Sequence, residues 1–234
     1  MIEILDWDST FFNFNIAHIN SDVDFDEKFI NKYVLDNDIN LLQCCVPTCN
    51  RNYIHKLEEN KFSFSGLNIT FNCNIESKIF TKNKLSLKKV KANEENNLIS
   101  IVENSFLNTR YNYNVFNKSK VSEMYKIWVK KSIIGDFDNE VLSLKLDEID
   151  IGFVTVNYFL DTARIGLLAI SNKLQGRGYG KAMIKLLKAY LFDKNIKRIV
   201  INTQGNNIVA QNLYISSGCS IEKIESWYYK EVKC

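Results

Sequence analysis

The chain has 234 residues and 46% of them are hydrophobic, which is enough for a packed core in one large domain or two small ones. The formal net charge of +3 at pH 7 is too small to favour a nucleic-acid-binding protein, but it is compatible with a polyanionic small ligand. No apolar stretch approaches the length needed to cross a bilayer, so we predict neither a nucleic-acid partner nor a membrane partner.

The cysteines form no regular framework, and no signal peptide is recognisable at the start of the chain. We therefore expect free thiols in a reducing environment and a cytoplasmic location. Cys45 and Cys49 lack a second ligand pair at metal spacing, and neither His18 nor His55 belongs to a ligand motif, so no metal is predicted. The six cysteines are Cys44, Cys45, Cys49, Cys73, Cys219 and Cys234.

In chain order, residues 1–80 predict a small N-terminal α/β domain. The side chains of Phe12, Phe14 and Ile16 alternate, which is typical of a strand with one buried face. The polar residues 81–84 are typical of a junction between domains. Between these points we expect a helix over 24–37, a buried strand over 41–46, a short helix over 50–59 and an alternating strand over 62–72.

Residues 85–234 predict a second domain with a different order of elements. We expect strands over 85–90, 141–146, 151–159, 163–170 and 198–203, helices over 94–106, 119–133, 181–191 and 207–217, and a final hairpin over 219–232.

A glycine-rich segment, Gln175-Gly176-Arg177-Gly178-Tyr179-Gly180-Lys181, follows the apolar run 163–170. Apolar side chains at 179, 182, 183, 186, 187, 190 and 191 then repeat at the spacing of an amphipathic helix. In a strand–turn–helix, glycines let the backbone approach a ligand closely, and the helix N-terminus adds partial positive charge. The segment therefore predicts a phosphate-binding site.

Two other phosphate-binding motifs do not fit this segment. The glycines are spaced G-x-G-x-G, and the strand expected over 198–203 ends without an acidic residue, which excludes a dinucleotide fingerprint. A P-loop would need glycine in place of Gln175 and serine or threonine in place of Ala182. A helix-capping turn that binds no ligand stays open as an alternative.

A second motif follows the loop, because Asn207 is placed to cap a short helix that carries Tyr214 near its end. The two segments together resemble the GCN5-related N-acetyltransferase superfamily, whose pyrophosphate loop Q/R-x-x-G-x-G/A is matched by Gln175, Gly178 and Gly180. The resemblance implies an α/β (α+β) fold with a mixed, mostly antiparallel central sheet flanked by helices. The elements expected from residue 85 onward follow the superfamily's order without a missing element.

The resemblance also implies that acetyl-CoA donates an acetyl group to an amine. A backbone N–H around Leu168 to Ile170 would stabilise the oxyanion, and Tyr214 would protonate the departing thiolate. The residues do not identify a general base. The implied cofactor-binding residues are Leu168, Ala169, Ile170, Gln175, Gly176, Arg177, Gly178, Tyr179, Gly180, Lys181 and Asn207, and the implied catalytic residue is Tyr214.

Two further segments narrow the resemblance. Leu5-Asp6-Trp7-Asp8-Ser9 followed by Phe11-Phe12 is similar to the opening of the TDP-fucosamine acetyltransferase family. Thr109-Arg110-Tyr111 resembles that family's S-R-F-x-x-D segment, although Asn114 stands in place of its aspartate. The resemblance implies a nucleotide-linked amino sugar as the acceptor, bound mainly by residues 1–80. The implied substrate-binding residues are Trp7, Phe11, Arg110 and Tyr111.

Other interpretations stay open. Trp7 and Phe11 could be core residues, because aromatic side chains bury well, and Arg110 could be an ion-paired surface arginine. The acceptor could be another small amine or a protein N-terminus, and a homodimer is compatible with the sequence. The alternative outside the enzymes is a non-catalytic acyl-CoA-binding protein. Tyr214 argues against it, because a protein that only binds acyl-CoA needs no acid to protonate a thiolate.

Overall fold

The computed structural model describes residues 2–75, 84–103, 105–106 and 109–232. Of the expected junction, residues 81–83 lie outside the described residues. The first part contains β1 (Ile2–Ile4), α1 (Asp6–Phe12), β2 (Ile16–Asn20), α2 (Glu27–Asp36), β3 (Leu41–Pro47), α3 (Arg51–Glu59) and β4 (Ser63–Asn74). The second part contains β5 (Leu85–Lys89), α4 (Glu95–Val102), α5 (Lys118–Ile133), β6 (Glu140–Leu146), β7 (Ile149–Phe159), β8 (Thr162–Ile170), α6 (Tyr179–Phe192), β9 (Arg198–Gln204), α7 (Ile208–Ser216) and β10 (Ser220–Glu231).

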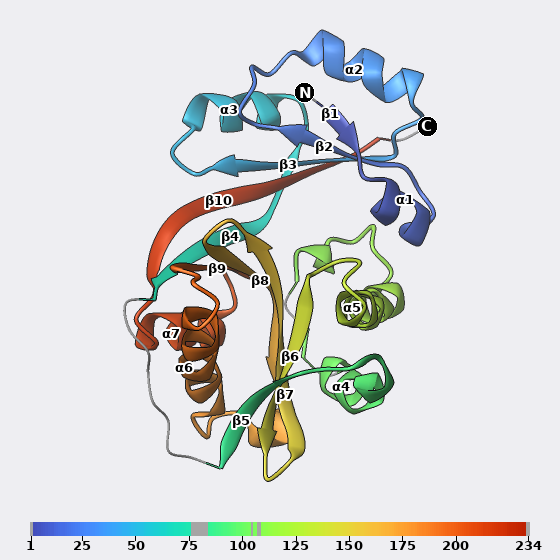
Figure 1. The fold of residues 1–234 in the computed structure, drawn as a ribbon. Helices are drawn as coiled ribbons and strands as arrows, with labels where there is room; N and C mark the ends of the chain where they lie inside the picture. Colours follow the sequence, from blue (N-terminus) through green and yellow to red (C-terminus); the bar gives the residue numbers. More distant parts are fainter. Residues whose placement is uncertain (1, 76–83, 104, 107–108, 233–234) are drawn as a thin grey trace.

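The strands form one ten-stranded sheet in the order β1-β2-β3-β10-β4-β9-β8-β7-β6-β5. The pairs β2–β3 and β8–β9 are parallel, and the other neighbouring pairs are antiparallel. In Figure 1, α6 and α7 cover one face of the lower part of the sheet, while α4 and α5 cover the opposite face. The mixed, mostly antiparallel sheet flanked by helices confirms the predicted fold class. None of the described helices is long and apolar enough to cross a membrane.

Side-chain caps fix where several helices begin. The carboxylate of Asp26 accepts a hydrogen bond from the Phe29 backbone N–H, 3.0 Å away, at the start of α2. Asn207 caps α7 as expected, because its side-chain oxygen accepts from the Ala210 N–H at 3.2 Å. Such caps satisfy N–H groups that the first turn of a helix leaves without an intrahelical acceptor.

The strand expected over 12–16 is wrong in its first residues, because β2 begins only at Ile16 and the preceding segment forms α1. Asp6 and Asp8 lie in the first turn of α1, where negative charge suits the positive end of the helix dipole. Asn13 ends the helix in the left-handed conformation, with a φ of 65°. An alternation over so few positions cannot distinguish a strand from a helix end.

The hairpin expected over 219–232 is also wrong, because β10 is one continuous strand. It lies between β3 and β4 and pairs antiparallel with both, so neither of its edges is free for a return strand. Trp227, for example, lies opposite Cys45 of β3 and Gly66 of β4. The two parts of the chain therefore share one sheet, because β10 lies between β3 and β4 and because β4 pairs with β9. Their separate roles as domains stay a prediction.

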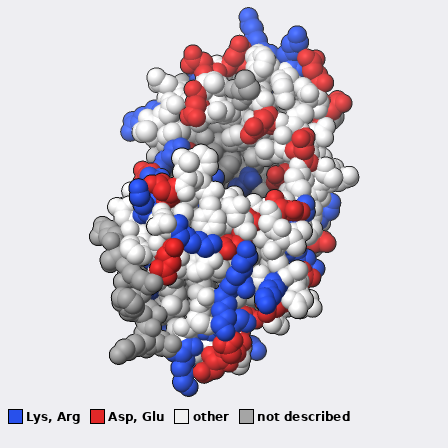
Figure 2. All heavy atoms as spheres, in the orientation of Figure 1, with Lys and Arg blue, Asp and Glu red and all other residues white. Residues whose placement is uncertain are grey.

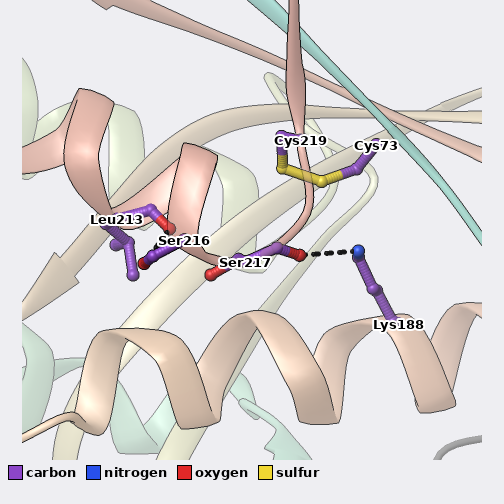
Figure 3. Close-up of a disulfide and its surroundings, with 6 residues drawn as sticks. All are labelled: Cys73, Lys188, Leu213, Ser216, Ser217 and Cys219. Atoms are coloured by element: carbon purple, nitrogen blue, oxygen red, sulfur yellow. Dashed lines mark hydrogen bonds between the residues drawn. A yellow bond between two sulfur atoms is a disulfide. The ribbon is translucent and has the colours of Figure 1, made fainter.

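The expectation of free thiols is wrong for one pair, because Cys73 and Cys219 form a disulfide (Figure 3). Cys73 lies near the end of β4 and Cys219 just before β10, and the β4–β10 register brings their Cα atoms to 4.3 Å. Since 146 positions separate them, their sequence spacing gives no sign of this contact. The free cysteines among the described residues are Cys44, Cys45 and Cys49.

Candidate active site

Strands β8 and β9 pair at one end only and then diverge. Their parallel ladder runs from Thr162 with Arg198 to Ile165 with Ile201. Beyond that point β8 continues to pair with β7, and β9 continues to pair with β4. The inner edges of both strands therefore face an opening, and an extended ligand could pair there as an additional strand would.

A cavity of about 1040 Å³ occupies this opening and extends to the first part of the chain. Its wall includes residues 165–168 of β8, residues 200–204 of β9 and Tyr214 of α7. The wall also includes Trp7 of α1 and Trp227 of β10. Figure 2 shows the surface hollowed near the middle of the molecule, between its upper and lower parts. The cavity joins the second motif, through Asn207 and Tyr214, to the region expected to hold the acceptor.

β8 carries a bulge beside this cavity. Gly166 and Leu167 both lie opposite Thr155, because the β7–β8 register shifts there, and the Leu167 N–H donates to Thr155 Oγ1 at 2.8 Å. Of the residues expected to supply an N–H, Leu168 lines the cavity, whereas the side chains of 169–170 are buried in the core. Gly166 and Leu167 also line the cavity and were not singled out from the sequence.

Tyr214 is only 5% exposed and lines the cavity from the second half of α7. Its ring lies edge-on against Phe71 of β4, with ring centroids 5.3 Å apart. Burial raises the pKa of its phenol above the ordinary value of 10, because the charged phenolate is poorly solvated there. Tyr214 therefore carries its proton at neutral pH, as a proton donor must.

The glycine-rich loop leads directly into α6. Gly176 and Gly178 have φ values of +74° and +83°, in the left-handed region that glycine adopts readily. A Cβ placed on either glycine would meet no atom within 4 Å, so the backbone surface there is open. Gly178 is the N-cap of α6, where Tyr179 is half-buried, and Arg177 and Lys181 are exposed. Open backbone N–H groups and two basic side chains at a helix N-terminus suit a pyrophosphate.

Two contacts hold this loop in place. The Gln175 side-chain amide donates to the Ile170 carbonyl at 3.0 Å and to Asn172 Oδ1 at 2.7 Å, which ties the loop to the end of β8. Gly180 lies against α7, since a Cβ there would come within 3.0 Å of Leu213 Cδ2. None of the described loop residues 175–181 belongs to the cavity wall, so loop and cavity are separate parts of the site.

Arg110 lies at the centre of a polar and aromatic cluster on the acceptor side of the cavity. Its guanidinium donates to Gln43 Oε1 at 2.7 Å and lies 4.8 Å from the Trp227 ring centroid and 4.2 Å from that of Tyr111. The Tyr111 hydroxyl donates in turn to Asp8 Oδ1 at 3.0 Å. The structure thus brings two expected substrate-binding residues, Arg110 and Tyr111, to one wall of the cavity.

The guanidinium of Arg110 keeps its charge in this setting. Burial lowers its pKa, but the interactions with Tyr111, Tyr229 and Asp8 outweigh burial and raise the pKa above the ordinary value. Among the residues that the structure describes, Arg110 forms no salt bridge at 4.0 Å or less. Arg110 is half-buried, so an anionic ligand group beside its guanidinium would form a charge-assisted pair that solvent screens only in part.

Of the two aromatic residues expected at the acceptor site, Trp7 lines the cavity and Phe11 does not. The Trp7 ring is stacked on Phe11 and edge-on to Phe137, and both centroid distances are 5.1 Å. Phe11 lies behind Trp7 and packs against the core beneath α1. Asn114 lines a smaller cavity of about 490 Å³, whose wall also includes Arg110.

Asp138 is a further cavity residue that sequence reasoning missed. It lies between α5 and β6, is 6% exposed, and accepts hydrogen bonds from Trp128 Nε1 at 2.8 Å and Ser132 Oγ at 3.2 Å. No motif marks it, because its neighbours come from α5, β7 and β8. Within the described part of the chain, no group of three or more His, Cys, Asp and Glu side chains could hold a metal ion.

Known proteins share this fold and parts of this sequence. A solved GCN5-related N-acetyltransferase from Sphaerobacter thermophilus superposes with a TM-score of 0.68 at 10% identity, covering 100% of this chain and 76% of that one. The dTDP-fucosamine acetyltransferase of Escherichia coli O6:H1 is 28% identical over 128 residues, covering 54% of each chain. The match thus spans about half the length of that relative. A ribosomal protein bS18-alanine N-acetyltransferase of Haemophilus ducreyi is 30% identical over 104 residues, covering 44% of this chain and 72% of that protein.

A family model described as the acetyltransferase (GNAT) family matches residues 102–218, which is half of the chain. The matched region contains the diverging strands, the glycine-rich loop and Tyr214. The predicted family is confirmed. The chain therefore belongs to the acetyltransferase (GNAT) family.

Proposed function

We propose that the protein transfers an acetyl group from acetyl-CoA to the amine of a nucleotide-linked amino-deoxy sugar. The observation that carries this proposal is the cavity that extends from the diverging strands β8 and β9, past Tyr214, to the guanidinium of Arg110. Such a cavity can bring a thioester and an amine into line, which removes much of the entropy cost of their reaction.

On the donor side, the pantetheine arm would lie along the free inner edge of β8, and the pyrophosphate would bind at the N-terminus of α6. The left-handed glycines Gly176 and Gly178 support this placement, because they leave the loop backbone open. The exposed Arg177 and Lys181 add positive charge near the same helix end. Asn207 supports the site less directly, by capping the helix that carries Tyr214.

The chemistry would take place where the thioester meets the β8 bulge. The amine nitrogen attacks the carbonyl carbon, and a backbone N–H near Leu168 stabilises the oxyanion. As the carbon–sulfur bond breaks, the sulfur takes the electron pair and receives a proton from Tyr214. The raised pKa of Tyr214 makes it a weak acid, so its contribution rests on position and on the charge that develops on the sulfur.

On the acceptor side, Arg110 supports a substrate that carries phosphate. Its planar guanidinium matches phosphate oxygens well, and the half-buried setting strengthens such a pair. Trp7 and Trp227 line the same cavity and add aromatic surface beside which a sugar ring could pack. The 28% identical dTDP-fucosamine acetyltransferase favours the same class of acceptor.

The test is to incubate the protein with acetyl-CoA and a panel of nucleotide amino sugars, following release of free thiol and product mass. Free amino sugars, small amines and a peptide with an N-terminal alanine serve as the competing acceptors. We expect acetylation of a nucleotide-linked 4-amino-4,6-dideoxy sugar at a kcat/KM well above that of the other amines. A preference for the peptide would replace the proposed acceptor, and acetyl-CoA binding without thiol release under any condition would favour a binding protein.

A further inference from the structure

A buried carboxylate lies directly on the reacting strand. Both oxygens of Asp138 lie over Gly166 of β8, at 2.5 and 3.0 Å from the position that a Cβ on this glycine would take. Any side chain at position 166 would therefore displace the carboxylate. Gly166 is part of the bulge that lines the cavity, so the carboxylate lies beside the backbone that would bind the thioester carbonyl.

The surroundings of Asp138 fix its position without neutralising its charge. Trp128 Nε1 and the Ser132 hydroxyl, both from α5, donate to Oδ2, and the Asp138 N–H lies 3.3 Å from Ser132 Oγ. Gly166 of β8 lies beneath the carboxylate and Thr155 Oγ1 of β7 lies 2.7 Å from the same Cβ position, and neither residue is charged. Within the described part of the chain, no Lys, Arg or His forms a salt bridge with Asp138.

Besides Asp138, the charged residues of the cavity wall are Asp8, Asp22, Arg110, Asp136, Arg164, Lys223 and Glu225. Asp136 lies two residues before Asp138 and is exposed. Arg164 of β8 also lines the cavity and is exposed. Glu140 follows in β6, but its carboxylate is engaged by Lys194 at 2.8 Å. A buried carboxylate that faces a cavity and lacks a cation is a functional-site candidate, because its charge is uncompensated until a cationic group arrives.

We propose that Asp138 is the catalytic group that takes a proton from the acceptor amine. The proposal rests on the N-acetyltransferase activity proposed above, because a protonated amine cannot attack a thioester. The ammonium first gives one proton to the Asp138 carboxylate, and the freed electron pair then forms the nitrogen–carbon bond. The carbon–sulfur bond breaks with its pair on sulfur, which takes the Tyr214 proton. A second proton leaves the nitrogen and restores the phenol, and Asp138 releases its proton to solvent.

A purely structural role would be that Asp138 only holds the turn between α5 and β6. Asp138→Asn separates the two roles, because asparagine keeps the shape and can still accept the bond from Trp128 Nε1, but cannot take a proton at neutral pH. Asp147→Asn is the matched control, since it removes one negative charge from an exposed turn after β6 that does not line the cavity. Circular dichroism, thermal unfolding and calorimetric acetyl-CoA affinity establish that both variants fold and bind the donor.

The experiment measures thiol release from acetyl-CoA with three nucleophiles: water alone, dTDP-4-amino-4,6-dideoxygalactose, and hydroxylamine. We expect Asp138→Asn to lower kcat about 10²-fold or more with water and with the amino sugar, the usual size of general base catalysis. Hydroxylamine is largely uncharged near neutral pH, so its rate should fall less than about tenfold in Asp138→Asn. Asp147→Asn should change each rate by less than about threefold. With the amino sugar, kcat/KM of the asparagine variant should keep rising with pH after the wild type has reached its plateau.

An equal loss with all three nucleophiles, or rates within about threefold of wild type for Asp138→Asn, would overturn the proposal. If the wild type does not acetylate the amino sugar, the proposed acceptor is wrong, and the water and hydroxylamine rates still decide the role of Asp138. The two proposals can therefore fail independently.

Discussion

The ring of Tyr214 lies edge-on against Phe71, with the two centroids 5.3 Å apart and Phe71 fully buried in β4. The backbone carbonyl of Tyr214 also accepts a hydrogen bond from the Cys219 N–H at 3.0 Å. The position of the phenol therefore depends on the sheet beneath α7 as much as on the helix itself. This arrangement allows the ring and the hydroxyl to be tested separately.

Tyr214→Phe keeps the ring against Phe71 and removes only the hydroxyl. If the hydroxyl protonates the leaving thiolate, kcat should fall by roughly 10²-fold or more while the KM for acetyl-CoA changes little. Steady-state kinetics would measure this, and the melting temperature should stay close to that of the wild type. The loss should shrink with an acyl donor whose leaving thiol has a lower pKa. Near-normal turnover with every donor would show that Tyr214 is only a packing residue.

Gly178→Val tests the loop at the start of α6. Space is not the obstacle, because no atom lies within 4 Å of an added Cβ, but the φ of +83° disfavours a branched residue. We expect a loss of about 1–2 kcal/mol from backbone strain and an acetyl-CoA affinity at least about tenfold weaker. Isothermal titration calorimetry of the folded variant measures the affinity. An unchanged dissociation constant would mean that the loop does not bind the pyrophosphate.

Arg110→Ala tests the acceptor side of the cavity. Losing a charge-assisted contact with phosphate should raise the acceptor KM by about tenfold or more, while the KM for acetyl-CoA should change by less than about threefold. Arg110→Lys keeps the charge but not the planar fork, so its acceptor KM should lie between those of wild type and alanine. Equal effects on both substrates would indicate a folding defect instead.

Cys219→Ser tests the disulfide. The bond closes a loop with a sequence separation of 146, and loops of this size are expected to contribute about 2–5 kcal/mol to the free energy of unfolding. Urea unfolding should show this loss, and dithiothreitol should lower the stability of the wild type toward that of the variant. Cys49→Ser removes an exposed free thiol and is the control. A wild type that does not respond to reductant would argue against the bond.

Alkaline pH should destabilise the protein. Burial raises the pKa of Tyr214, Tyr111 and Tyr53, and burial with the nearby Glu58 raises that of Tyr228 to about 12. Above about pH 10 the unfolded chain loses phenolic protons that the folded chain retains, so the free energy of unfolding should fall as pH rises from there toward 12. Urea titrations across this range measure the fall. Tyrosinate absorbance should appear at higher pH in the folded than in the unfolded protein.

The sequence predicted the strand, the glycine-rich loop and the two helices of the cofactor side, because each depends on residues that are close together in the chain. The run 163–170, the glycine loop and α6 depend on side-chain period and on backbone freedom, which a short window of sequence contains. The capping of α7 by Asn207 is local for the same reason. Where the sequence offered only a short alternation, as over 12–16, α1 was missed.

The other misses share a long-range cause. The single strand β10 is decided by the two partners that flank it, and the Cys73–Cys219 bond by the register of β4 with β10. Asp138 was missed because its neighbours Trp128 and Gly166 meet it only after α5 packs on the sheet. None of these contacts leaves a repeating pattern in the chain.

The position of β10 also sets an order of events during synthesis. Residues 220–231 leave the ribosome after both of their partners, β3 and β4, have been made. Until then the inner edges of β3 and β4 present unpaired backbone groups, which are templates for aggregation. Pairings as distant as Trp227 with Cys45 also slow folding. A chaperone would therefore be most useful while β3 and β4 have been synthesised and β10 has not.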